Sequence, residues 1–187
     1  MKTGRFSWAV MVGAAIALSA SFVSAQGINS TAQPITLSAK LNETLTLNLS
    51  SSTVNFNLSA GSATNAGTSG VTATTTWVLA PGRANVNVYA YFASSTAALT
   101  DGTNNIPSSA FYIKDGTNPA AALTNSYTGF GGTNAALLLG TTAITTANRS
   151  SNRTDAMTFN IDLSTGTLPQ LPASTYAGTL TIQAQAL

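Results

Sequence analysis

Oxygen-rich side chains cluster in two short stretches of this 187-residue chain. Residues 101–105 (DGTNN) and 115–118 (DGTN) carry carboxylate, hydroxyl and amide oxygens, the ligand types that a hard cation such as calcium takes. Neither stretch has the spaced acidic residues or the final glutamate of a calcium loop, whereas Asp-Gly is a common signal for a tight turn. The sequence therefore favours plain turns and predicts no metal site.

Catalytic groups are scarce. The chain contains no histidine and no cysteine, so histidine triads, thiolate chemistry, Cys/His zinc sites and disulfides are all excluded. Of the five acidic residues, Asp155 and Asp162 lie seven positions apart around one expected strand. An odd separation on a strand places two side chains on opposite faces, which is poor geometry for an acid and base pair. We expect no enzymatic activity, no catalytic residue and no cofactor.

Two pairs of residues are candidates for binding a ligand or another protein. Tyr89 and Tyr91 fall on the polar face of an expected strand, where aromatic rings stack on sugars or anchor an interface, although covering by a second sheet explains them equally well. Arg149 and Arg153 lie in the polar stretch ANRSSNRTD, which we interpret as a basic loop. A basic loop can bind an acidic sugar or another subunit, and two arginines on a loop are also common on a plain solvated surface.

Alternation of apolar and polar residues with period two recurs along most of the chain. It predicts strands near residues 35–41, 45–49, 54–58, 71–79, 85–92, 110–114, 134–146, 156–164 and 176–186. Pro81-Gly82 predicts a hairpin turn between two of them, Gly140 a bulge, and residues 116–132 a loop. No long helix is expected beyond the amino-terminal segment. The pattern is typical of an all-β fold, an antiparallel Ig-like or Greek-key sandwich of eight or nine strands.

The first 25 residues have the pattern of a secretory signal peptide. Lys2 and Arg5 precede an apolar run, and Val23-Ser24-Ala25 fits a cleavage site. Cleavage leaves one domain, residues 26–187, with five basic and five acidic residues and a formal net charge of zero. A neutral chain predicts no nucleic-acid partner, and low charge favours self-association. We expect an exported protein of the periplasm, cell surface or extracellular space, without a membrane anchor after cleavage.

Two stretches, one near each end of the expected domain, resemble known protein families. The stretch LNLSSSTVNFNLSAGS and the closing stretch LPQLPASTYAGTLTIQAQAL resemble exported bacterial surface proteins, namely pilin-like subunits of the spore coat protein U type and WxL-domain proteins. The closing match rests on Leu171, Pro172, Ala173, Tyr176, Gly178, Thr179, Leu180 and Thr181. The paired cysteines common in pilins are missing. Ile182 stands where the WxL pattern has its second tryptophan, although Trp77-Val78-Leu79 matches the first.

This resemblance implies a structural or adhesive surface protein whose copies pair at strand edges. In pilin-like assemblies an amino-terminal extension supplies the strand, a role that residues 26–34 with 35–41 suit here, although we favour residues 35–41 as the first strand of the protein's own sheet. The expected partners are other copies or other surface proteins. The alternative is a carbohydrate-binding module that stacks a polysaccharide on Tyr89, Tyr91, Tyr127 or Phe130.

Overall fold

The structure is a computed structural model that describes residues 28–187. The expected signal peptide, residues 1–25, lies outside the described residues. All strands belong to one compact unit, Lys40–Leu187, and residues 28–39 belong to a separate unit. Across residues 28–187, no helix reaches the length and apolar character needed to cross a bilayer.

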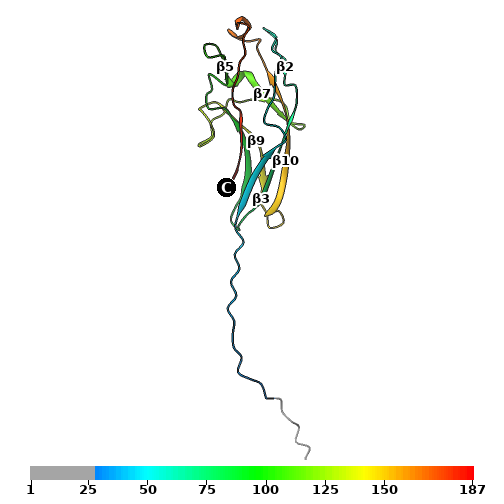
Figure 1. Cartoon of the computed structure of the whole chain (residues 1–187), viewed down its shortest axis with the longest axis vertical. Coiled ribbons are helices and arrows are strands. Elements are labelled where there is room, and N and C mark those ends of the chain that lie inside the picture. The colour runs from blue at the N-terminus through cyan, green and yellow to red at the C-terminus, as the bar shows by residue number, and fades with distance from the viewer. Residues whose placement is uncertain (1–27) are drawn as a thin grey trace, which may run out of the picture. The chain divides into compact units, whose positions relative to one another are not determined.

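Two antiparallel sheets form the domain (Figure 1). The first has the order β1-β3-β10-β7-β8, with β2 also paired to β10, and the second has the order β11-β4-β9. Their strands are β1 (Thr44–Leu49), β2 (Asn65–Ala66), β3 (Val71–Val78), β4 (Asn85–Tyr91), β7 (Phe111–Asp115), β8 (Ala121–Ala122), β9 (Ala136–Ala143), β10 (Ser150–Ile161) and β11 (Thr181–Ala186). A small hairpin joins β5 (Leu99–Thr100) to β6 (Asn105–Ile106). Beyond two 3-10 turns, at Ser108–Ala110 and Leu168–Gln170, the described residues contain no helix.

Alternation along the central strands explains why the two sheets stack. On β10, Asp155, Met157, Phe159 and Ile161 are buried, while the residues between them are exposed or half-buried. Side chains on a strand point to opposite faces in turn, so a strand of this pattern buries one face only. The all-β sandwich predicted from the sequence is therefore confirmed.

Most of the core is one apolar cluster between the sheets. Phe111 lies at its centre, with its ring edge-on to Phe92 at 5.1 Å and to Phe56 at 5.8 Å between ring centroids. A second, smaller cluster contains Trp77, Leu79 and Val86 at the end of the domain where β3 gives way to β4. Without disulfides, this buried apolar surface is the main source of stability.

The turn at Pro81-Gly82 is present, but it does not connect a hairpin. It links β3 in the first sheet to β4 in the second, so the predicted hairpin between these strands is wrong. The turn signal was correct, whereas alternation alone does not say which strand lies beside which. The predicted bulge is confirmed, because the pairing of β4 with β9 shifts register next to Gly140.

Two predicted strands are absent. Residues 35–41 have no regular structure, and residues 54–58 form only an isolated bridge between Phe56 and Gly67. The interpretation of residues 35–41 as the first strand of the protein's own sheet is therefore wrong. Alternation shows only that a segment can bury one face. Within this domain β1 pairs with β3 alone, and residues 35–41 form no strand beside it.

Candidate functional site

A groove lies between residues 49–60 and residues 171–182. Its larger part has a volume of about 760 Å³ and the smaller part about 200 Å³. Val54 and Gly178 line both parts, so the two parts adjoin at these residues. We call this feature the groove.

The walls of the groove are the chain segments next to the two edge strands, and each of these strands contributes one lining residue, Leu49 of β1 and Ile182 of β11. β1 ends the first sheet and β11 ends the second, and they lie beside each other without pairing. Residues 51–58 continue the wall from β1, and residues 171–180 lead into β11. Within the described part of the chain, the backbone groups of Val54, Phe56 and Leu58 form no backbone hydrogen bond. An edge with unpaired backbone groups is a template for another strand.

The floor of the groove is the hydrophobic core itself. Phe111, Met157 and Phe159 line the smaller part, and Ile161, Leu163 and Leu168 line the larger part. Each of these six side chains is less than a tenth exposed. None of the residues that line either part is charged. The groove can therefore accept apolar side chains, and it offers nothing to an ionic ligand.

Local contacts hold the carboxyl-terminal wall in place. Ala177 and Thr100 exchange two backbone hydrogen bonds of 2.9 Å, and the hydroxyl of Tyr176 donates to the carbonyl of Pro172 at 3.0 Å. Gly178 passes so close to Ala98 that a Cβ there would collide with the Ala98 carbonyl oxygen. Contacts with Thr100 and Ala98, neither of which lines the groove, therefore help to fix this wall.

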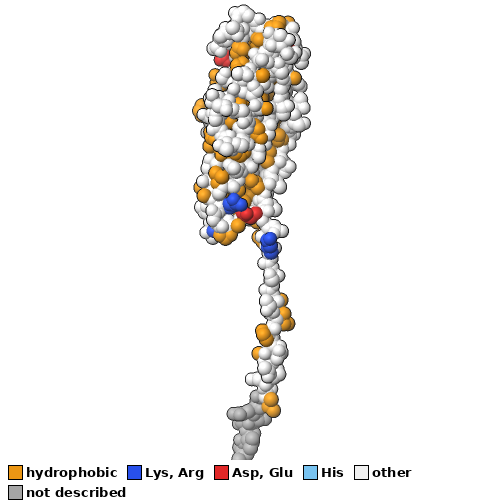
Figure 2. Space-filling model, turned by 90° about the vertical axis from the view of Figure 1, so that its left-hand side faces the viewer, with side chains coloured by type: hydrophobic (Ala, Val, Ile, Leu, Met, Phe, Trp, Pro, Cys, Tyr) orange, Lys and Arg blue, Asp and Glu red, His pale blue; other side chains and the backbone are white. Residues whose placement is uncertain are grey.

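The segment before β1 carries exposed apolar side chains. Ile35, Leu37 and Leu41 are 84–89% exposed, and hydrophobic side chains stand out along this segment in Figure 2. Exposed apolar residues at every second position are unusual on a soluble surface, where such groups are normally scattered.

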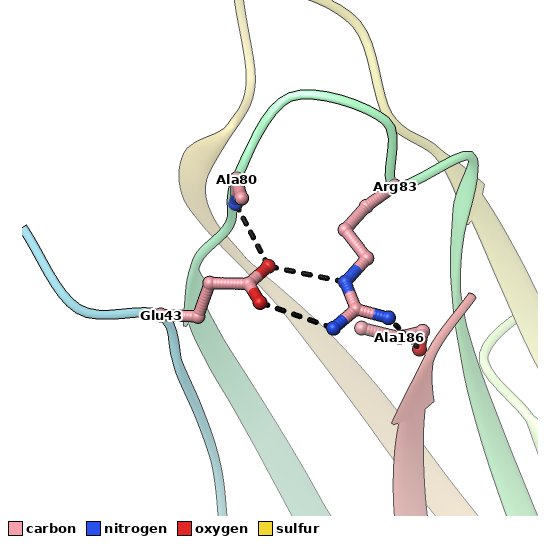
Figure 3. A network of polar contacts seen from close by, with 4 residues as sticks. All are labelled: Glu43, Ala80, Arg83 and Ala186. Carbon is pink, nitrogen blue, oxygen red and sulfur yellow. Dashed lines mark hydrogen bonds and ion pairs between the residues drawn. The ribbon is translucent and has the colours of Figure 1, made fainter.

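An ion pair marks the start of β1 (Figure 3). The Glu43 carboxylate accepts hydrogen bonds from the Ala80 backbone N–H at 2.8 Å, from Arg83 Nε at 3.1 Å and from Arg83 Nη2 at 3.0 Å. Arg83 Nη1 also donates to the carbonyl of Ala186 on β11 at 3.5 Å. Hydrogen bonds from the Arg83 side chain and the Ala80 backbone lower the pKa of Glu43 to about 2. We call these contacts the clamp, because they join the ends of the two edge strands.

A second charged group is buried between the sheets. Arg153 donates from Nε to Asp155 Oδ2 at 3.0 Å, pairs with Oδ1 through Nη2, and reaches Thr142 on β9 from Nη1 at 3.3 Å. Asp155 is 2% exposed. Burial raises the pKa of Asp115 on β7, and the nearby charge of Asp155 raises it further, while Arg153 opposes the shift. The sequence did not indicate this carboxyl pair, because its members are 40 positions apart and strand pairing brings them together.

The predicted binding residues do not form one site. Arg153 lies on β10 and its side chain is 18% exposed, so the prediction that it belongs to a loop is wrong. Arg149 comes just before β10, is partly exposed, and has a backbone carbonyl that accepts the Leu79 N–H at 2.8 Å. β10 extends further toward the amino terminus than the strand predicted from apolar alternation. The inward positions of this part of β10 hold the charged residues Arg153 and Asp155, which form an ion pair, so the apolar pattern does not reach it.

Aromatic residues cover Tyr89. Its ring stacks on Phe130 at 4.1 Å between centroids and lies 4.9 Å from Tyr127, and it is 6% exposed. Tyr91 is partly exposed, and its hydroxyl donates to Gln183 Oε1 at 2.7 Å. A sugar has no access to the ring face of Tyr89 in this packing, because residues of the same chain already fill that space.

The two Asp-Gly stretches form turns. Asp101 Oδ1 accepts the backbone N–H groups of Thr103 at 2.9 Å and Asn104 at 2.6 Å, and these bonds lower the pKa of Asp101 to about 2. Gly102 and Gly116 both adopt positive φ, as tight turns require. Over residues 28–187, no three His, Cys, Asp or Glu side chains come together as metal ligands.

No protein-family model and no curated protein matches the chain.

Proposed function

We propose that this chain is an exported structural subunit whose copies assemble by strand-edge pairing. Residues 28–41 of one copy lie in the groove of the next copy, between residues 49–60 and residues 171–182. One observation carries the proposal: the chain has both a groove that opens onto its core and an exposed segment with the alternation of a strand.

The groove is suited to an inserted strand. Its uncharged floor would bury one face of that strand, and burial of apolar surface contributes roughly 25 cal/mol per Å². Its walls offer backbone groups, including those of Val54 and Phe56, that lack backbone partners among the described residues. Main-chain bonds then give affinity, and alternate side chains that enter the groove give specificity.

The segment before β1 has the matching chemistry. Ile35, Leu37, Ala39 and Leu41 share one face of an extended chain, and Lys40 is the one charged residue between positions 28 and 41. In extended form, residues 35–41 span roughly 20 Å, at about 3.3 Å per residue. Full burial of each large apolar side chain contributes roughly 1.5–3 kcal/mol before the cost of ordering the segment.

Support for export comes from the amino-terminal sequence. Lys2, Arg5, the apolar run that follows them and the small residues before Gln26 form the pattern of a cleaved signal peptide. Cleavage before Gln26 would place the donated segment directly at the new amino terminus, where its insertion meets no preceding domain of this chain.

Light scattering after size exclusion tests the proposal. The mature chain, residues 26–187, should form a concentration-dependent series of multiples, and Ile35→Asp with Leu37→Asp should reduce this series to monomer. The matched control is Thr36→Asp with Ser38→Asp, which adds the same charge to the opposite face and should keep more of the series. Because no groove residue is charged, the series should also change little with salt. A wild-type chain that stays monomeric at high concentration would contradict the proposal.

A further inference from the structure

The two ends of the domain carry opposite charge. Arg149 and Asp162 flank the twelve residues of β10. At about 3.3 Å per residue along a strand, these two residues lie roughly 40 Å apart. The net side-chain charge is positive around Arg149 and negative around Asp162.

The end at Arg149 is basic. Arg149 lies beside the clamp, because its carbonyl accepts a hydrogen bond at 2.8 Å from the residue that precedes Ala80. Glu43 balances Arg83 within the clamp, so the charges of Lys40 and Arg149 remain unbalanced. The basic side chains in view in Figure 2 gather at this end. We call it the basic end.

The opposite end is acidic. Asp162 follows β10, and Asp101 begins the turn between β5 and β6. Asn105, which follows that turn, lines the same surface cavity of about 410 Å³ as Asp162. The N–H groups of its own turn hold the pKa of Asp101 at about 2, and the Ser164 side chain lowers the pKa of Asp162. We call this end the acidic tip. The other charged residues of the described chain lie between the two ends and cancel: Lys114, Asp115, Arg153 and Asp155.

The larger part of the groove reaches the acidic tip. It is lined by Leu168, which begins the 3-10 turn at the extreme of the domain in Figure 1. It is also lined by Ser174, whose hydroxyl helps to lower the pKa of Asp101. The smaller part ends at Leu49 and Ile182, beyond which β1 and β11 lie beside each other. The groove therefore has one mouth at Ser174 and another at Leu49.

Residues 28–41 can enter the groove of another copy in either of two directions, a choice that rests on the proposed function. Only one residue separates Leu41 from Glu43, so the basic end of the donor lies directly at the mouth by which its segment leaves. At the Leu49 mouth, the donor domain would lie over β1 and β11, on the side of the acceptor's own basic end. At the Ser174 mouth, it would meet the acidic tip.

We propose that copies join head to tail, with the basic end of the donor against the acidic tip of the acceptor. Lys40 and Leu41 point to opposite faces of an extended segment, so Lys40 stays at the rim of the groove, on the side where Asp101 lies. Exposed ion pairs add little affinity, but complementary charge speeds encounter and disfavours arrangements that bring like charges together. Salt should therefore slow association while it leaves the series at equilibrium nearly unchanged.

Cross-linking in the mature chain tests the direction, because the native chain has no cysteine. The donor carries Asn42→Cys. The acceptor carries Ile35→Asp and Leu37→Asp, which prevent donation, and either Ser174→Cys at one mouth or Ser52→Cys near the other. A short bismaleimide should join the donor to the Ser174→Cys acceptor, as measured by the mass of the product. The Ser52→Cys acceptor is the matched control and should give no such product.

The outcomes separate this inference from the proposed function. A product with the Ser52→Cys acceptor in place of the Ser174→Cys acceptor overturns the inference and leaves the proposed function intact. A donor–acceptor complex in which neither acceptor is cross-linked also overturns it. A donor that forms no complex with either acceptor in light scattering contradicts the proposed function itself.

A rate measurement tests the acidic tip separately. Asp101→Asn with Asp162→Asn in the acceptor should slow association with the donor several-fold at low ionic strength, and the difference should vanish at high salt. The matched control is Thr76→Lys with Thr141→Lys, which raises the net charge equally at exposed positions away from the tip and should slow association far less. Equal rates for the two acceptors at low salt would overturn the role of the acidic tip.

Discussion

The guanidinium of Arg153 occupies the space in which any side chain at position 140 would lie. A Cβ on Gly140 would stand 2.9 Å from Arg153 Nη1 and 3.0 Å from Cζ, and closer still to Nη2. Asp155 holds the guanidinium in this place by two contacts. Glycine at the β9 bulge thus allows a side chain of one sheet to pass against the backbone of the other.

Substitution of that glycine should destabilise the domain. Gly140→Ala forces the guanidinium away from Asp155, and overpacking of this kind costs typically 1–3 kcal/mol. Chemical denaturation measures the loss, with the exposed neighbour Thr141→Ala as the control. Equal stability of the two variants would mean that Arg153 moves aside freely.

Asp115 should destabilise the fold as the pH rises above the ordinary carboxyl pKa, rather than as the pH falls. Its pKa is raised by burial and by the charge of Asp155, so the folded state favours the protonated form. A raised carboxyl pKa destabilises the fold above that pKa and has no effect below the ordinary value of 3.8. Asp115→Asn should therefore raise the melting temperature at pH 7, and the difference should fade as the pH falls toward 3.8. A gain that is equal at all pH values would show that charge is not its cause.

The clamp should respond to pH in the opposite sense. The pKa of Glu43 is lowered from 4.5 to about 2, so its stabilising contribution is complete above 4.5 and is lost as the pH falls toward about 2. Glu43→Gln should lower the melting temperature at pH 7 and make no difference near pH 2. The effect should be modest and weaken with salt, because both side chains of the pair are 36–43% exposed. A salt-independent loss would argue against an ionic contribution.

Thr75 offers a route to higher stability. It is fully buried on β3, opposite Arg153, and its hydroxyl has no hydrogen-bond partner among the described residues. An unsatisfied buried polar group costs about 1–3 kcal/mol, so Thr75→Val should stabilise the domain by part of that amount. The exposed Thr76→Val on the same strand is the control, and a loss of stability at position 75 would indicate a hidden partner for the hydroxyl.

Sequence patterns predicted those parts of the fold that depend on one strand at a time. Strands β3 and β10 follow from alternation because each buries one face, and the bulge follows from Gly140. The sequence patterns did not predict which strands pair with each other. The Pro81-Gly82 turn changes sheets instead of closing a hairpin, and alternation does not report strand order.

In the candidate site, too, the sequence predicts features of single segments but not the contacts between strands. The alternation of residues 35–41 predicts a segment that can bury one face, but it does not predict a partner strand, and these residues pair with no strand in the structure. Asp115 and Asp155 approach each other only because β7 pairs with β10, which places Asp115 opposite Met157. The polar stretch around Arg153 predicts a loop because an inward-facing charge breaks the apolar pattern of a strand, whereas in the structure Asp155 pairs with Arg153 at that inward position.

A peptide of residues 28–41 tests the central claim most directly, namely that the groove of one copy takes this segment from another. The acceptor is the mature chain with Ile35→Asp and Leu37→Asp, which keeps its groove but cannot donate. The account predicts that the wild-type peptide binds with one-to-one stoichiometry in calorimetry and raises the melting temperature, and that a peptide with the same two substitutions does neither. Equal behaviour of the two peptides, or no binding of the wild-type peptide, would contradict it.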